Sequence, residues 1–252
     1  METNGDGLAA TLDSLAKLLK PQSAKEASTM LQQQSKLQEG EPKILFRIAS
    51  ALHDHGRYDE ALLFCLHSMR ICKKGANQVD LTYPLSLMGA VLKAKGELHQ
   101  AAECHRRAAE IREQQLGPGH LDVASSLNQL ALVHKVMGHS EEVGAVVACY
   151  CISCCLPSSS FTFSFSFQAV ALTRRALAIR EASLGPKHLE VASTLYDLAL
   201  SLKAKLCYQE AAEALQRALP ILSVELGDEH YYVMAAASDL KWLQQHIMGH
   251  WC

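Results

Sequence analysis

The chain has 252 residues, of which 49% are hydrophobic and 20% are charged, so a disordered chain is excluded and a sizeable globular core is expected. Its formal net charge of −2 gives no reason to expect a nucleic acid as a partner. The first residues are acidic rather than basic, and the nine cysteines do not form a disulfide framework by number or spacing. We therefore expect a cytoplasmic rather than a secreted protein.

Residues 1–42 begin the chain with two helical stretches. Apolar residues recur at helical spacing in Leu8–Lys20, which ends before Pro21, and a second helical stretch covers Ala24–Leu37. Neither stretch has the pattern found farther along the chain. We expect residues 1–42 to be a degenerate N-terminal helical segment that caps the units that follow.

From residue 43 onward the chain repeats itself. The pattern Leu-Gly-x-x-His occurs at residues 116–120, 184–188 and 226–230. The second and third copies are 42 residues apart, whereas the first and second are 68 residues apart, which exceeds the period by 26. A long period indicates a chain of similar supersecondary units. The surplus of 26 residues predicts an insertion into one of these units.

Alignment on this pattern brings small residues into columns. The columns are Ala49, Gly89, Ala131 and Ala199; then Ala61, Ala101, Ala169 and Ala211; then Ser68, Ala108, Ala176 and Ala218. Residues seven apart lie on one face of a helix, so small columns with apolar neighbours indicate helices that pack closely. Each unit therefore has two helices, for example Asp122–Met137 as a first helix and Tyr208–Glu225 as a second helix.

Glycines mark the predicted ends of the first helices. Gly56, Gly96 and Gly138 stand where a left-handed residue is wanted, and glycine adopts that conformation without steric penalty. The fourth unit has Leu206 at this position. Because a left-handed conformation costs a non-glycine residue about 1 to 2 kcal/mol, we expect the fourth turn to be rearranged.

Residues 143–168 account for the surplus of 26 residues. Without them Glu142 joins Ala169 and the spacing returns to 42. The segment carries no charge and ends in alternating phenylalanine and serine or threonine, whose codons can be mostly pyrimidines. Val143 begins with the nucleotides GT in every codon, and Gln168 can be CAG. We therefore interpret residues 143–168 as a translated intron of 78 nucleotides.

Other interpretations of this segment stay open. The uncharged run Val143–Leu172 exceeds the roughly 20 residues that span a bilayer, although half of its later part is serine and threonine. Cys151 and Cys154 have metal-ligand spacing but no second pair nearby, and the alternating phenylalanines resemble an edge strand. If the segment is present, we expect a loop that protrudes at the start of a second helix, with Ser166 as the N-cap of that helix.

The chain resembles the tetratricopeptide repeat family, in the subgroup of kinesin light chain and nephrocystin. The resemblance rests on the 42-residue period, on Leu-Gly-x-x-His and on the run Leu-Asn-x-Leu-Ala at Leu127–Ala131, and it covers Lys43 to about Gln245. It implies an all-α fold, an α-solenoid of tetratricopeptide helical hairpins with about four repeats and a C-terminal capping helix.

The same resemblance implies how the units and the function are arranged. Residues 43–142 would hold repeats 1 and 2 and the first helix of repeat 3, residues 169–230 the rest of repeat 3 and repeat 4, and residues 231–252 the capping helix and tail. The first helices would line a concave groove that binds peptide segments of partner proteins, as in a scaffold or adaptor. A membrane-tethered adaptor anchored by residues 143–168 is the alternative. Sustained heptads are absent from residues 1–42, so we do not expect kinesin heavy chain as a partner.

Candidate groove residues follow from the alignment and the resemblance. One helical turn after the small residue of each first helix stands a basic residue: His53, Lys93, Lys135 and Lys203. A basic column would attract short acidic peptides, whereas lysines near helix C-termini also complement the helix dipole, and both interpretations stay open. Neighbouring groove positions are Phe46, Ser86, Asn128 and Tyr196.

No constellation of side chains predicts an enzyme, a cofactor or a metal site. His120, His188 and His230 recur at the repeat period, so they lie on units about 10 Å apart, too far to share one ion. We expect them to have a structural role at the turns. The glycines are single and stand at helix ends rather than in a phosphate-binding loop. The expected partners are therefore proteins.

Overall fold

The structure is a computed structural model that describes residues 42–73, 78–151 and 159–249, with the backbone alone described for residues 139–151, 159–164 and 248–249. Except for Pro42, the predicted N-terminal segment lies outside the described residues. Residues 152–158 of the predicted insertion and the last three residues also lie outside them.

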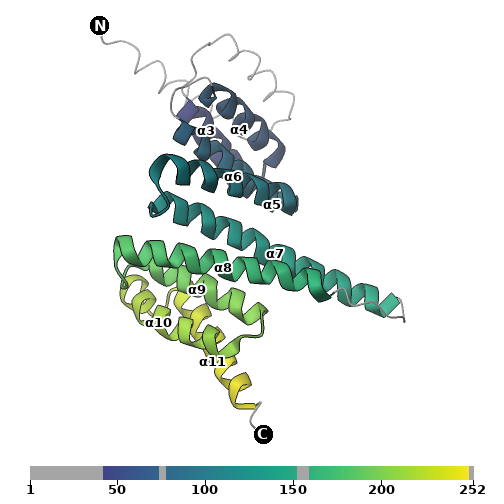
Figure 1. Cartoon of the computed structure of the whole chain (residues 1–252), viewed down its shortest axis with the longest axis vertical. Coiled ribbons are helices and arrows are strands. Elements are labelled where there is room, and N and C mark those ends of the chain that lie inside the picture. Colours follow the sequence, from purple (N-terminus) through teal and green to yellow (C-terminus); the bar gives the residue numbers. More distant parts are fainter. Residues whose placement is uncertain (1–41, 74–77, 152–158, 250–252) are drawn as a thin grey trace.

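The described residues form four antiparallel helical hairpins and a final helix, without a strand. The elements are α3 (Pro42–Asp54), α4 (Tyr58–Cys72), the 3-10 turn η1 (Gln78–Leu81), α5 (Thr82–Lys95), α6 (Leu98–Leu116), α7 (Leu121–Cys151), α8 (Ser159–Leu184), α9 (Leu189–Ala204), α10 (Tyr208–Leu226) and α11 (Tyr231–Gly249). Figure 1 shows the hairpins stacked one after another along the long axis of the molecule. The predicted all-α solenoid is confirmed.

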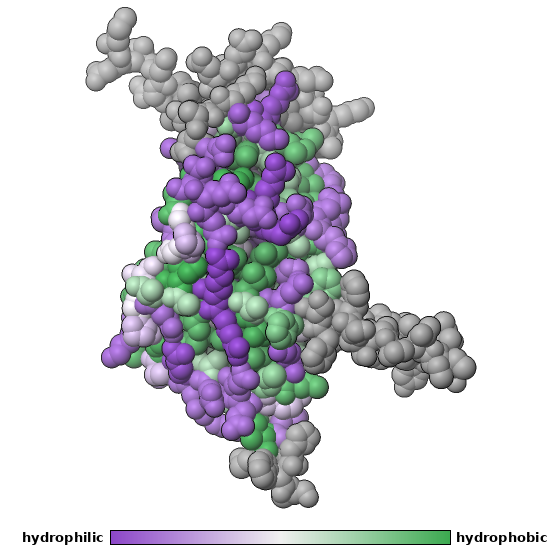
Figure 2. Space-filling view, in the orientation of Figure 1, coloured by the Kyte–Doolittle hydropathy of each residue, from purple (hydrophilic) through white to green (hydrophobic). Residues whose placement is uncertain are grey.

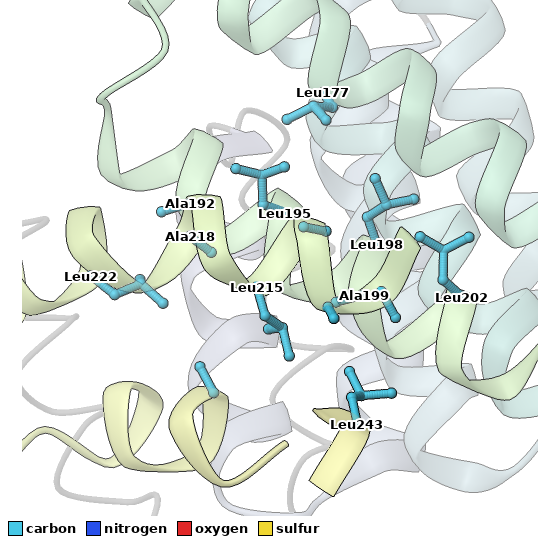
Figure 3. Packing of buried hydrophobic residues seen from close by; sticks show 14 of the residues in the cluster. Leu177, Ala192, Leu195, Leu198, Ala199, Leu202, Leu215, Ala218, Leu222 and Leu243 are labelled. Carbon is cyan, nitrogen blue, oxygen red and sulfur yellow. The ribbon is translucent and has the colours of Figure 1, made fainter. Parts of the chain in front are cut away.

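The predicted small columns are buried between the packed helices. Ala61, Ala101, Ala169 and Ala211 are fully buried. In the last hairpin Leu195 and Leu198 of α9 pack in one cluster with Leu215 of α10 (Figure 3). Leu243 of α11 joins this cluster and is also fully buried. The final helix therefore covers the apolar side of the fourth hairpin, as a capping helix does.

The turns between hairpins combine a glycine and a histidine. Gly117, Gly185 and Gly227 have φ angles of +89°, +85° and +84°, which L side chains rarely adopt. The Nδ1 atom of each histidine accepts a hydrogen bond from the backbone N–H two residues later, at 3.1 Å for His120, 3.2 Å for His188 and 3.2 Å for His230. This bond satisfies a helix N–H that has no partner within the helix. The expected structural role of the three histidines is confirmed.

Two buried arginines tie second helices to the following hairpins. Arg112 of α6 is 6% exposed and donates from Nη1 to the hydroxyl of Ser126 at 2.5 Å. Arg180 of α8 donates to the hydroxyl of Thr194 at the same position one unit later. A buried guanidinium needs acceptors for its donors. These hydroxyls accept from Nη1 of both arginines, whereas Nε of Arg180 has no hydrogen-bond partner among the described residues and lies 3.4 Å from Oε2 of Glu190. The 68-residue separation of the two arginines, equal to that of the Leu-Gly-x-x-His copies, would have revealed them in the sequence.

The expected loop and N-cap at the insertion are wrong. Helix α7 continues through Gly138 to Cys151, and α8 begins at Ser159, so Gly138 does not end a helix and Ser166 does not begin one. Figure 1 shows the ends of α7 and α8 projecting together beyond the neighbouring hairpins. Lengthening both helices keeps their backbone groups hydrogen-bonded, whereas a loop would interrupt them. A Cβ atom on Gly138 would lie 3.1 Å from Oγ of Ser166, so this glycine serves a close contact between helices.

The expected rearrangement at Leu206 is also wrong. Leu206 has a φ of +61°, a left-handed conformation like that of Gly56 at +74° and Gly96 at +84°. The N–H of Leu206 donates to the carbonyl of Lys203 at 3.0 Å, and the next N–H, that of Cys207, donates to Leu202 at 3.0 Å. The glycine turns make the same two bonds. The hairpin contacts therefore impose the turn on leucine despite its steric cost.

Candidate peptide-binding face

The helices α3, α5, α7, α9 and α11 form a continuous surface, which we call the first-helix face. Side chains join α3 to α5, α7 to α9 and α9 to α11 along it, and α5 and α7 share a buried apolar cluster. The contacts are an edge-on ring pair, Phe46 with Tyr83, and two hydrogen bonds, Asn128 to Asp197 and Tyr196 to Asp239. Three candidate groove residues thus contact the neighbouring first helix, each through a side chain that was not itself a candidate.

Two lysines lie in the middle of the first-helix face. Burial lowers the pKa of Lys93 on α5, and the charge of Lys135 on α7 lowers it further. Burial also lowers the pKa of Lys135. Asp197 opposes both shifts, but neither lysine forms an ion pair with a carboxylate among the described residues. The centre of the face therefore holds two cations that share one anion.

Polar atoms without partners lie among the candidate groove residues of α5 and α7. Nδ2 of Asn128 donates to Oδ2 of Asp197 at 2.8 Å, while its Oδ1 is buried with no hydrogen-bond partner in the described part of the chain. Oγ of Ser86 is likewise buried without a hydrogen-bond partner among the described residues. An unpaired buried polar atom costs about 1 to 3 kcal/mol. Because Oδ1 of Asn128 is enclosed by the chain itself, Asn128 takes part in the face through its bond to Asp197.

At the C-terminal end of the face the third lysine is neutralised. Nζ of Lys203 lies 2.8 Å from Oδ1 of Asp239 and 4.3 Å from the ring centroid of Trp242. The hydroxyl of Tyr196 donates to the other oxygen of Asp239 at 3.3 Å. Burial, together with the charge of Asp239, raises the pKa of Tyr196 to about 12. Lys203 therefore already has a carboxylate partner within the chain, unlike Lys93 and Lys135 among the described residues.

The remaining candidates lie at the N-terminal end. The ring centroids of Phe46 and Tyr83 are 6.3 Å apart, and both rings line a pocket of about 340 Å³. His53 already has a partner on its own helix, because its Nδ1 lies 3.2 Å from Oδ1 of the adjacent Asp54. This end of the face is more aromatic than charged.

The acidic partners of the basic column were not foreseen from the sequence. Asp197 and Asp239 are 42 residues apart and occupy the same position of successive first helices. Each lies opposite candidate residues of the preceding first helix: Asn128 for Asp197, and Tyr196 and Lys203 for Asp239. The period applied to acidic residues, and not only to small and basic ones, would have found them.

Other chemistry is limited within the described residues. They contain no group of three or more histidine, cysteine or acidic residues that could hold a metal ion, and the side chains of Cys149, Cys151, Cys154 and Cys155 lie outside them. Burial raises the pKa of the Cys65 thiol to about 12. No helix in the described part is long and apolar enough to cross a bilayer.

A model of the tetratricopeptide repeat matches residues 80–142 and 167–222. The chain is similar in structure to BtubC (BKLC) from P. vanneervenii, at 16% identity and a TM-score of 0.66, over 89% of this chain and 84% of that one. It is also similar to a putative kinesin light chain with nearly identical TPR-like repeats from Podosopora anserina, at 19% identity and a TM-score of 0.62, over 82% and 88%. No curated protein matches the sequence.

The chain is a tetratricopeptide-repeat protein, and its solenoid resembles that of kinesin light chain. At these identities the similarity of structure shows the fold alone. Tetratricopeptide solenoids present extended surfaces to other proteins, so the fold is that of a protein-interaction scaffold. The two matched ranges leave out residues 143–166, which nearly coincide with the predicted insertion.

Proposed function

We propose that the chain is a cytoplasmic, non-enzymatic adaptor that binds short acidic peptide segments of partner proteins on the first-helix face, in the manner of kinesin light chain. The observation that supports this most strongly is the pair Lys93 and Lys135, which have Asp197 as their one shared acidic neighbour within the described part of the chain. Partial burial strengthens their attraction for a ligand carboxylate, because charges interact more strongly as the effective dielectric falls. The buried free thiols of Cys65 and Cys72 suit a reducing compartment.

The geometry suggests a register for the ligand. Packed helices are about 10 Å apart, and an extended peptide advances about 3.3 Å per residue. Lys93 and Lys135, one repeat apart, would therefore pair with acidic side chains about three residues apart. Lys203 would contribute little, since Asp239 neutralises it.

A titration with a fluorescein-labelled peptide that carries acidic residues three apart tests the proposal. Fluorescence anisotropy should show binding that weakens as salt is added, because the contact is electrostatic. Reversal of both central charges, Lys93→Glu with Lys135→Glu, should weaken binding at least tenfold. Circular dichroism should confirm that the variant retains its helix content.

The matched control reverses two exposed charges elsewhere, Lys187→Glu with Lys241→Glu. Both double variants change the net charge equally, so a general charge effect would weaken binding in both. The proposal requires a loss in the central variant alone. Equal affinity of the central variant and the unaltered chain would exclude the lysine pair as the binding site.

A further inference from the structure

A second surface, formed by α4 and α6, contains an open groove of about 600 Å³. Leu62 and Leu66 of α4 form one wall, Met88 and Leu92 of α5 form the floor, and Glu97 and Glu103 lie on the side of α6. Leu66 in this wall is 52% exposed, whereas Leu62 is partly buried. An exposed leucine in the wall of a groove whose floor is also apolar indicates that something apolar covers it.

An ion pair bridges the corresponding junction between α8 and α10. Arg174 of α8 forms an ion pair with Glu210 of α10 there. The repeat alignment places Leu66 at the position of Arg174 and Gln100 at the position of Glu210. The groove therefore lacks the polar bridge of the later junction and has an exposed apolar side chain instead.

The junction between α6 and α8 is filled by an aromatic side chain. The ring of Phe165 stacks on His134 at 5.7 Å and packs against the core cluster of α5, α6 and α7. Leu92, on the floor of the groove, is the repeat equivalent of His134. One repeat later, the same kind of site is thus occupied by a helical segment with an apolar side chain.

We infer that residues 8–19 of this chain dock in the α4–α6 groove as an amphipathic helix. In their sequence Leu8, Leu12, Leu15 and Leu19 recur at steps of four, three and four residues, which places them in one stripe of a helix. Four leucines in a stripe would meet the apolar wall and floor of the groove. Lys20 follows at the edge of the stripe and complements the glutamates beside the groove, whereas Lys17 lies on the opposite, solvent-facing side of the helix.

The connection of the chain favours its own segment over one from another molecule. The carbonyl of Pro42, where the described chain begins, accepts a hydrogen bond from Oγ of Ser68 at 3.0 Å, so the chain enters beside the later part of α4. Even with Ala24–Leu37 helical, the linker from residue 20 to Pro42 can reach about 45 Å, whereas α4 is about 22 Å long. Tethering also gives the segment a local concentration in the millimolar range.

Site-specific photocrosslinking in the full chain tests the inference. A benzoylphenylalanine placed at position 66 is tolerated because Leu66 is exposed. Irradiation followed by proteolysis and mass spectrometry should identify a crosslink to residues 8–20 within the same chain. The substitution Leu15→Asp should reduce the crosslink at least tenfold, because it puts a charge in the leucine stripe.

The matched control is Ser14→Asp, which adds the same charge one residue away and outside the stripe, and should leave the crosslink unchanged. Hydrogen exchange provides a second measurement: peptides from α4 and from the start of α6 should exchange faster in Leu15→Asp than in Ser14→Asp. A crosslink only to a second copy of the chain, or none to residues 8–20, would overturn the inference. Equal exchange in the two variants would also overturn it.

Discussion

The imidazole of His105 in α6 lies directly against Gly89 in α5. A Cβ atom at Gly89 would be 2.6 Å from Nε2 of this ring and within 2.9 Å of two further ring atoms. The ring is 1% exposed, so it has little room to move away. The other three hairpins combine an alanine with a smaller or aliphatic partner at these positions: Ala49 with Cys65, Ala131 with Thr173, and Ala199 with Leu215. Glycine and histidine therefore form a matched pair in the second hairpin.

The contact between Gly89 and His105 predicts that a larger residue at position 89 destabilises the chain and that a smaller one at position 105 restores its stability. Gly89→Ala should lower the free energy of unfolding by about 1 to 3 kcal/mol, because overpacking a buried site costs that much, although alanine is the better helix former. Combining it with His105→Leu recreates the Ala199–Leu215 pair and should restore stability. Urea unfolding of the unaltered chain, both single variants and the double variant gives the coupling energy. Additive effects would show that the two side chains do not interact.

The same histidine predicts how stability depends on pH. Burial, followed by the charges of Lys93 and Arg112, lowers the pKa of His105 from 6.5 to about 4. Between these values the unfolded chain binds a proton that the folded chain does not. The free energy of unfolding should therefore fall as pH drops from 6.5 towards 4, by about 1.4 kcal/mol per pH unit. Above pH 6.5 His105 is neutral in both the folded and the unfolded chain, so it causes no loss of stability there.

The Gly89→Ala/His105→Leu variant is the control for this pH effect, because it keeps every other titrating group. Urea unfolding at pH 7, 6 and 5 should show a smaller loss of stability in the variant than in the unaltered chain. The difference between the two proteins isolates His105 from the carboxylates and from His134. Parallel curves for the two proteins would mean that His105 titrates alike in the folded and unfolded states.

Leu206 predicts a stabilising substitution. Its side chain is 71% exposed and its φ is +61°, so Leu206→Gly should raise the free energy of unfolding by about 1 kcal/mol through relief of the left-handed strain. Leu206→Ala keeps a Cβ atom and should not produce this gain. Thermal or urea unfolding of the two variants separates backbone strain from the removal of an exposed leucine. A gain of the same size in both would assign the effect to the side chain.

Leu206 also shows where inference from sequence stops. The 42-residue period and the small columns predicted the helical hairpins and their packing, because helix spacing and close contact depend on residue size and order. The turn at Leu206 and the helical continuation through Gly138 depend on tertiary hydrogen bonding and pairing, which override local preference. The occupation of Lys203 by Asp239 joins residues 36 apart, so it depends on how two helices are placed. The lysine column was visible in the sequence, but not which lysines are neutralised.

Asp197 predicts a variant with stronger peptide binding. Asp197→Asn removes the carboxylate that Lys93 and Lys135 share, while its side-chain amide can still accept the hydrogen bond from Asn128. A charge interaction at a partly exposed site is worth about 1 kcal/mol or less, so the affinity for the acidic peptide should rise by up to about fivefold. Asp228→Asn removes the same charge from an exposed turn and is the control. Equal gains in both variants would indicate a general charge effect in place of a local one.

The interpretation of residues 143–168 as a translated intron predicts two forms of the chain. Where the segment is spliced out, Glu142 is joined to Ala169, and trypsin should release a peptide that runs from Val136 to Glu142 and continues from Ala169 to Arg174. The shortened chain should still fold, because each repeat contacts mainly its neighbours and the described parts of α7 and α8 outside the segment carry buried columns such as Ala131 and Ala176. Mass spectrometry of protein from its natural source decides the question. Peptides that run only from Glu142 into Val143, with none across the predicted junction, would show that the segment belongs to the mature chain, where it lengthens both helices of the third hairpin.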